Sequence, residues 1–133
     1  MEITFDGNKR INASYNGFVI KTDQPESAGG GGSAPSPFDL FLASLGTCAG
    51  IFAVGFLQSR NLPTEGFKIN LSFDWDEKSH LVKKVGINIT LPKDFPQQYK
   101  AALIKSAELC TVKRHLANPP DFEITASSDI KGE

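Results

Sequence analysis

An uncharged run from Leu40 to Leu57 constrains the fold of this 133-residue chain more than any other feature. Ser36 comes just before it and is suited to cap a helix, and Pro37 is favoured at the first helical position. Asp39 then falls in the first turn, where a carboxylate complements the helix dipole. The sequence therefore predicts one long helix from Phe38 to Arg60.

Three explanations of so apolar a helix are open. It can span a membrane, since about 18 uncharged residues is the usual threshold, it can be the buried central helix of a domain, or it can lie at the centre of a dimer. Its flanks lack an aromatic belt and positive clusters, which argues against a membrane. A helix buried on all sides is hard to arrange in a short chain. Because a second subunit would cover the remaining face, we favour a homodimer.

The segments around this helix alternate polar and apolar residues as β-strands do. Strands are expected over residues 2–5, 10–15, 18–20, 67–75, 81–91 and 122–126. Asn16-Gly17 is a strong hairpin signal between the second and third of these. Helical spacing is found over residues 97–109, and residues 111–117 fit another turn or two of helix. Together these elements predict a single α+β domain over residues 1–133, with antiparallel sheets around the long helix.

Residues 23–37 hold four consecutive glycines, Gly29 to Gly32, and several prolines. A phosphate-binding loop would carry Lys-Ser or Lys-Thr after the glycines, and none follows here. We interpret the segment as a flexible linker.

The formal net charge is -1 and the pI is about 6.1. A nucleic-acid binder usually shows a basic face, and a membrane-surface binder a polybasic patch; neither is found. The N-terminus lacks the regions of a signal peptide, so we expect a cytoplasmic protein that binds neither nucleic acid nor membranes.

The two cysteines, Cys48 and Cys110, are the main chemical candidates. One lies in the apolar run and the other at the end of the second helical segment, so tertiary structure must bring them together. In a reducing compartment a cysteine pair is more often catalytic than structural, although a buried cysteine is commonly an inert apolar residue. With His80 and His115 they could form a zinc site, but zinc motifs repeat closely spaced ligand pairs. We expect no metal and no cofactor.

The segment from Pro35 to Cys48, PSPFDLFLASLGTC, resembles the signature of the OsmC/Ohr family of thiol peroxidases, in particular its OsmC-like subgroup. Cys110, followed by Thr111 and Val112, is similar to the second cysteine segment of that family. The resemblance covers essentially the whole chain.

This resemblance implies an intertwined α+β homodimer with its long helices buried at the centre. Cys48 would attack the distal oxygen of an organic hydroperoxide, and Cys110 would resolve the product as a disulfide. A dithiol reductant, lipoyl-type in one branch, would restore both thiols. In that branch an arginine of the N-terminal strands, held by an acidic residue, activates the thiolate. Arg10 and Asp39 are the candidates here, although Asp39 stands one residue later than the family's acid.

Two other functions stay open. The protein can be a dimer with little peroxidase activity that binds a small apolar ligand and merely buries its cysteines. It can also be a general thiol-disulfide redox protein that does not use peroxide.

Overall fold

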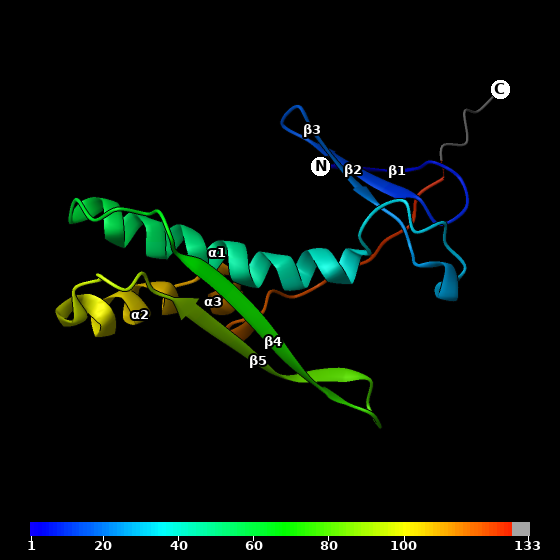
Figure 1. Cartoon of the computed structure of the whole chain (residues 1–133). Coiled ribbons are helices and arrows are strands. Elements are labelled where there is room, and N and C mark those ends of the chain that lie inside the picture. The colour runs from blue at the N-terminus through cyan, green and yellow to red at the C-terminus, as the bar shows by residue number, and fades with distance from the viewer. Residues whose placement is uncertain (129–133) are drawn as a thin grey trace.

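The computed structural model of the chain, described here over residues 1–128, has two antiparallel sheets and three α-helices (Figure 1). In chain order the elements are β1 (Glu2–Phe5), β2 (Ile11–Tyr15), β3 (Phe18–Thr22), the 3-10 turn η1 (Glu26–Ala28), α1 (Pro37–Ser59), β4 (Lys68–Asp76), β5 (Leu81–Thr90), the 3-10 turn η2 (Gln97–Tyr99), α2 (Lys100–Glu108) and α3 (Thr111–Ala117). The expected α+β class and the expected antiparallel pairing are confirmed.

Helix α1 begins where its sequence signals place it. The Ser36 hydroxyl accepts a hydrogen bond from the Asp39 amide (3.1 Å), and the Asp39 carboxylate accepts one from the Ser36 amide (3.0 Å). This reciprocal capping box satisfies two amides that would otherwise lack partners at a helix start. The predicted helix and its N-cap are therefore confirmed.

Strands β1, β2 and β3 form a sheet, named here the N-terminal sheet, that lies beyond one end of α1 (Figure 1). The predicted Asn16-Gly17 hairpin is confirmed, because both residues adopt the positive φ angles (48° and 80°) that a tight β-hairpin turn requires. All four residues of β1 are exposed, as are the first four of β3.

Strand β4 crosses α1 at two glycines. A Cβ atom on Gly46 would lie 2.6 Å from Cδ1 of Leu71, and one on Gly50 would lie 3.6 Å from Cδ1 of Ile69. The helix and strand can approach this closely because α1 presents no side chain there. Strand β5 then pairs with β4 along its length, with a bulge between Asp74 and Trp75.

The core lies between α1 and α2. It contains Ala53, Phe56 and Leu57 of α1, Leu103 of α2 and Phe95 from the preceding loop. The Ser106 hydroxyl donates a hydrogen bond to the Phe52 carbonyl (3.0 Å), which ties the two helices together.

One face of α1 is buried and the opposite face is not. Leu45 and Ala49 are 3 % and 1 % exposed, whereas Ile51 is 71 % exposed. By length and composition alone α1 is also long and apolar enough to cross a membrane, and the core helices of soluble proteins pass the same test. Because Ile51 is exposed, a single chain covers only part of α1, and the full burial of this helix stays a prediction.

Two expected elements differ from the structure. The helix expected over residues 97–109 begins as η2 and becomes α-helical at Lys100. The final strand expected over residues 122–126 is wrong for the single chain: the segment is not paired, and Phe122 and Ile124 are 86 % and 95 % exposed. Its alternating pattern suits a strand, but a strand also needs a neighbour, and residues 1–128 offer it none.

Candidate active site

The two cysteines predicted as reactive come together between α1 and α3. Cys48 lies in the middle of α1 and is partly exposed, and Cys110 is fully buried just before α3 begins. Both are free thiols, and Cys110 lies close enough to Cys48 to contribute to lowering its pKa. Two residues distant in the sequence thus become direct neighbours.

The start of α3 surrounds the Cys48 sulfur with hydrogen-bond donors. The backbone amides of Val112 and Thr111 and the Thr111 hydroxyl are the groups of this turn that lower the pKa of Cys48. Cys110 is the N-cap residue of α3, and its own side chain makes no capping hydrogen bond. The first amides of α3, which lack partners within that helix, therefore lie near the Cys48 sulfur.

These donors make Cys48 more acidic than an ordinary cysteine. The hydrogen bond from the Val112 amide contributes most to lowering the pKa of Cys48, and the bonds from Cys110 and Thr111 lower it further. Partial burial opposes them, because it disfavours the charged thiolate. The net direction is downward, which favours the nucleophilic form of the sulfur.

Arg10 lies away from this cluster in the single chain. Its guanidinium donates two hydrogen bonds to the Asp6 carbonyl in its own turn, at 2.7 and 3.1 Å. The hydrogen bonds to Cys48 come from residues 110–112 and not from Arg10. The role expected for Arg10 as the activating cation stays a prediction.

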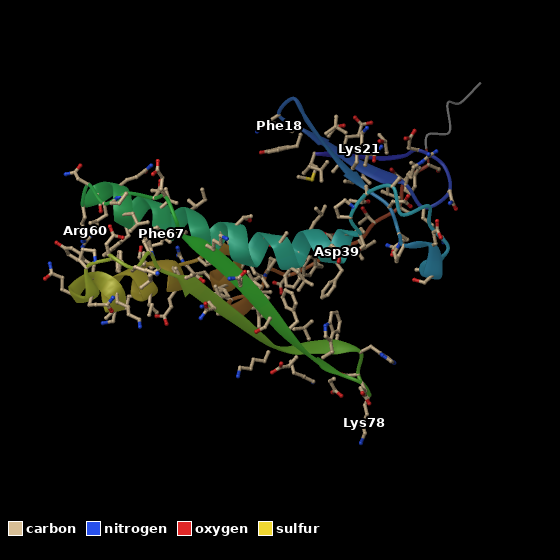
Figure 2. The ribbon with its side chains drawn as sticks, viewed as in Figure 1. Phe18, Lys21, Asp39, Arg60, Phe67 and Lys78 are labelled. Atoms are coloured by element: carbon tan, nitrogen blue, oxygen red, sulfur yellow. The ribbon has the colours of Figure 1, made fainter. Side chains whose placement is uncertain are left out.

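Asp39 lies in the first turn of α1, about two and a half helical turns before Cys48. Figure 2 shows it near the end of α1 that faces the N-terminal sheet, with Arg60 at the opposite end. Its carboxylate belongs to the capping box with Ser36, which accounts for its place in the first turn. A second role in orienting an arginine also stays a prediction.

The histidines considered as metal ligands lie apart. His80 occupies the turn between β4 and β5, and the His115 ring bonds through Nδ1 to the Thr111 carbonyl at 2.8 Å. Over residues 1–128 no group of three or more His, Cys, Asp or Glu side chains is placed to hold a metal ion.

A buried carboxylate organises the glycine-rich loop, and sequence reasoning missed it. Asp23 is 1 % exposed and accepts hydrogen bonds from the Ser33 hydroxyl (2.6 Å), the Ser33 amide (3.0 Å) and the Gln24 amide (2.7 Å). These bonds lower the pKa of Asp23 from 3.8 to about 2, the Ser33 hydroxyl contributing most. A short acidic side chain before a glycine run is a known turn signal. The loop is thus confirmed as irregular, but it is anchored to Asp23 and is more than a linker.

A groove of about 780 Å³ opens beside the thiols. Helix α1 contributes Leu45 and Ala49, one helical turn before Cys48 and the residue after it, and α3 contributes Lys113 and Leu116. Most of the other lining side chains are apolar and come from β5, α2 and the loop between them: Val85, Ile87, Asn88, Ile89, Leu91, Pro92, Lys93, Gln97, Lys100, Leu103, Ile104, Ala107 and Glu108. A groove of this size and lining can hold a small organic molecule.

Comparisons with known proteins agree with this fold. A family model described as OsmC-like protein matches residues 30–125, and the chain belongs to this family. A search among curated proteins finds no match.

Three solved structures share the fold. One, from Psychrobacter arcticus 273-4, is assigned to the osmotic stress induced and detoxification response; it is 23 % identical with a TM-score of 0.74, over 85 % of this chain and 84 % of that one. A structural genomics structure is 19 % identical with a TM-score of 0.73, over 89 % and 88 %. An organic hydroperoxide resistance protein OsmC from Legionella pneumophila, described as a predicted redox protein, is 17 % identical with a TM-score of 0.53, over 86 % and 85 %. At these identities the likeness concerns the fold alone.

Proposed function

We propose that this protein is a thiol-dependent peroxidase that reduces organic hydroperoxides in the cytoplasm. The observation that carries the proposal is that Cys110 and the start of α3, at Thr111 and Val112, lie close enough to Cys48 to lower its pKa. A lowered pKa gives the thiolate that attacks peroxide, and an adjacent thiol protects its product. Membership of the OsmC-like family and the name of the Legionella structure support a role in peroxide stress.

The proposed reaction uses the two sulfurs in turn. The Cys48 thiolate attacks the distal oxygen of the hydroperoxide; the S–O bond forms as the O–O bond breaks, and the alkoxide takes a proton and leaves as an alcohol. The sulfenic acid of Cys48 then condenses with the Cys110 thiol, which forms a disulfide and releases water. An external dithiol, for which a lipoyl group is the candidate, supplies two electrons and two protons to restore both thiols.

The proposed working unit is a homodimer. The N-terminal sheet exposes large apolar side chains, including Phe5 at 81 % and Phe18 at 72 %, and α1 exposes Ile51. Large exposed apolar side chains in such number are typical of an interaction site, and a small sheet gains stability when its apolar side chains are covered. A second copy would cover both surfaces and can bring its own Arg10 toward Cys48.

Thiol counting tests the reaction. The reduced protein is treated with a slight excess of cumene hydroperoxide, and free thiols are counted under denaturing conditions. We expect the loss of two thiols per chain, no loss in Cys48→Ser, and over-oxidation of Cys48 in Cys110→Ser. If wild-type protein keeps both thiols through many equivalents of hydroperoxide, the peroxidase proposal fails.

The groove favours a second candidate function, the binding of a small apolar ligand without peroxide chemistry. Its walls are largely apolar, and Lys93, Lys100 and Lys113 lie among its lining. Two unreactive thiols together with saturable binding of a fluorescent fatty acid would favour this alternative.

A further inference from the structure

We propose that Ser106 is a positioning residue that holds Cys110 at the level of Cys48 and so sets how readily the two sulfurs form a disulfide. The Ser106 hydroxyl donates a hydrogen bond to the Phe52 carbonyl, inside α1, at 3.0 Å. This role rests on the proposed function for its biological meaning, but the pairing of the two thiols can be tested without any hydroperoxide.

The Ser106 bond lies one helical turn from each cysteine. Phe52 follows Cys48 by four residues on α1, and Ser106 precedes Cys110 by four residues at the end of α2. Four residues make about one helical turn, a rise of about 6 Å. The bond therefore joins the turn after one cysteine to the turn before the other.

Helices α1 and α2 run antiparallel. Farther from the cysteines, the ring of Tyr99, at the start of α2, meets the ring of Phe56 on α1, with their centroids 6.3 Å apart. From this contact to the Ser106 bond, the partners move toward the start of α1 as they move toward the end of α2. One turn beyond that bond, the same register brings Cys110 to the level of Cys48.

The register between α1 and α2 depends on this polar contact. Within residues 1–128 it is the one hydrogen bond that joins these two helices, and the core that they share, with Leu57 and Leu103, is apolar. Apolar packing is non-directional, whereas a hydrogen bond requires a narrow range of distance and angle. The Leu109 amide in turn donates to the Ser106 carbonyl (3.1 Å), which fixes the residue directly before Cys110.

A disulfide leaves its two cysteines little freedom. Cys110 is fully buried, and a disulfide requires Cα atoms about 4.4–6.8 Å apart. In the proposed reaction the Cys110 sulfur displaces the hydroxyl of the Cys48 sulfenic acid, which leaves as water with the thiol proton. A slide of α2 along α1 would separate the reacting sulfurs. Because Phe52 lies within α1, its carbonyl keeps its place in the helix when the Ser106 hydroxyl is removed, so the fold should survive that change.

Disulfide formation in glutathione buffers tests this role, since no hydroperoxide is present. The protein is equilibrated over a range of ratios of reduced to oxidised glutathione, its thiols are trapped, and the intramolecular disulfide is quantified by mass spectrometry. We expect Ser106→Ala to lower the equilibrium constant for the disulfide by roughly threefold to tenfold, because the loosened turn must then be ordered when the sulfurs join. Ser106→Thr keeps the donor and should stay within about twofold of wild type.

The reaction with cumene hydroperoxide gives a second readout. Ser106→Ala should consume the first equivalent of hydroperoxide at about the wild-type rate, because Cys48 makes that attack. It should then accumulate sulfinic acid on Cys48, since slower condensation with Cys110 leaves the sulfenic acid open to more hydroperoxide. A general loss of structure would slow both steps.

Ser59→Ala is the matched control, because it also removes a helical hydroxyl, but one that bonds to the Phe56 carbonyl of its own helix (2.8 Å). It should leave the disulfide equilibrium unchanged. If Ser106→Ala loses the native near-ultraviolet spectrum, Ser106→Val against Ser106→Thr makes the same comparison at nearly constant shape.

A folded variant that lacks the Ser106 hydroxyl but keeps the wild-type disulfide equilibrium would overturn the proposal. A loss that Ser106→Thr does not recover would overturn it as well, because the hydroxyl would not be the cause. A shifted equilibrium in a protein that never consumes hydroperoxide would instead leave the role of Ser106 standing and remove the peroxidase function.

Discussion

The helical unit, here α1, β4, β5, α2 and α3, buries part of its large apolar side chains, whereas the N-terminal sheet leaves all of its own exposed. The helical unit buries Leu57 and Leu103 to 1 % exposure, whereas the N-terminal sheet leaves Phe5 and Phe18 largely exposed. The strands of both regions follow ordinary alternating patterns. The difference shows that a segment can adopt its predicted secondary structure without burying its apolar side chains. Burial also requires another part of the protein, or a partner, to cover those side chains.

The same contrast applies to the candidate site. The helical unit contains the two thiols and the groups that lower the pKa of Cys48. Arg10 lies in the region of the N-terminal sheet, and its guanidinium binds the Asp6 carbonyl. A complete site with an activating cation would thus need the two regions to meet in a way that one chain does not provide. Substitutions matched between the regions can test this division.

The largest expected effect is on the core of the helical unit. Leu103→Ala removes a side chain that is 1 % exposed and packs against α1, so we expect a loss of about 2–5 kcal/mol in the free energy of unfolding. Phe18→Ala is the control on the N-terminal sheet, where exposure predicts a change within about 0.5 kcal/mol for an isolated chain. Urea unfolding at low protein concentration measures both. A loss below about 1 kcal/mol for Leu103→Ala would contradict the assigned core.

The next effect concerns the crossing of α1 and β4. Gly46→Ala places a methyl group 2.6 Å from Leu71, so we expect overpacking to cost about 1–3 kcal/mol. Gly55→Ala lies in the same helix with no atom within 4 Å, and should gain about 0.5–1 kcal/mol from its better helix propensity. Thermal unfolding of both variants checks the pair. A clear loss in Gly55→Ala would mean that a partner covers this face of α1.

Much of the fold was predictable because its signals are local. Ser36 and Asp39 cap α1 within three residues, and Asn16-Gly17 forms its turn from its own backbone preferences. The segment over residues 122–126 has the alternation of a strand but no partner in the described chain, and pairing depends on distant residues. The sequence pattern was a guide to conformation there, but not to pairing.

The sequence singled out the two cysteines of the candidate site, but it did not indicate their surroundings. Cys48 and Cys110 stood out as the two cysteines of the chain, and the family signature supplied the roles expected of them. The effect of Thr111 and Val112 on Cys48 depends on how α3 docks against α1, which the family segment around Cys110 did not indicate. Asp23 was missed for a similar reason: its partner Ser33 lies across a loop whose path was unknown.

The third effect concerns the loop that joins the two regions. Asp23 has a pKa lowered to about 2, so its charged form stabilises the fold fully above pH 3.8. That contribution is lost as the pH falls from about 4 to about 2. Asp23→Asn should lower Tm by several degrees at pH 7 and should lose less stability than wild type on acidification. Glu26→Gln, an exposed carboxylate in the same loop, is the control and should leave Tm unchanged. Parallel acid profiles of wild type and Asp23→Asn would show that Asp23 does not anchor the loop.

The smallest expected change in intrinsic stability is on the N-terminal sheet, and it bears most directly on what covers that sheet. Val19 is 60 % exposed, so Val19→Lys should alter the stability of an isolated chain by no more than about 0.5 kcal/mol. If a second copy covers the sheet, wild type should sediment as a dimer with a Tm that rises with protein concentration. The variant should then shift toward monomer and lose that concentration dependence.

Asn70→Lys adds the same charge at an exposed position of β4 and controls for charge alone. A wild-type protein that stays monomeric at every concentration would leave the apolar surface of the sheet without its proposed partner, and Arg10 without a route to Cys48 from a second chain.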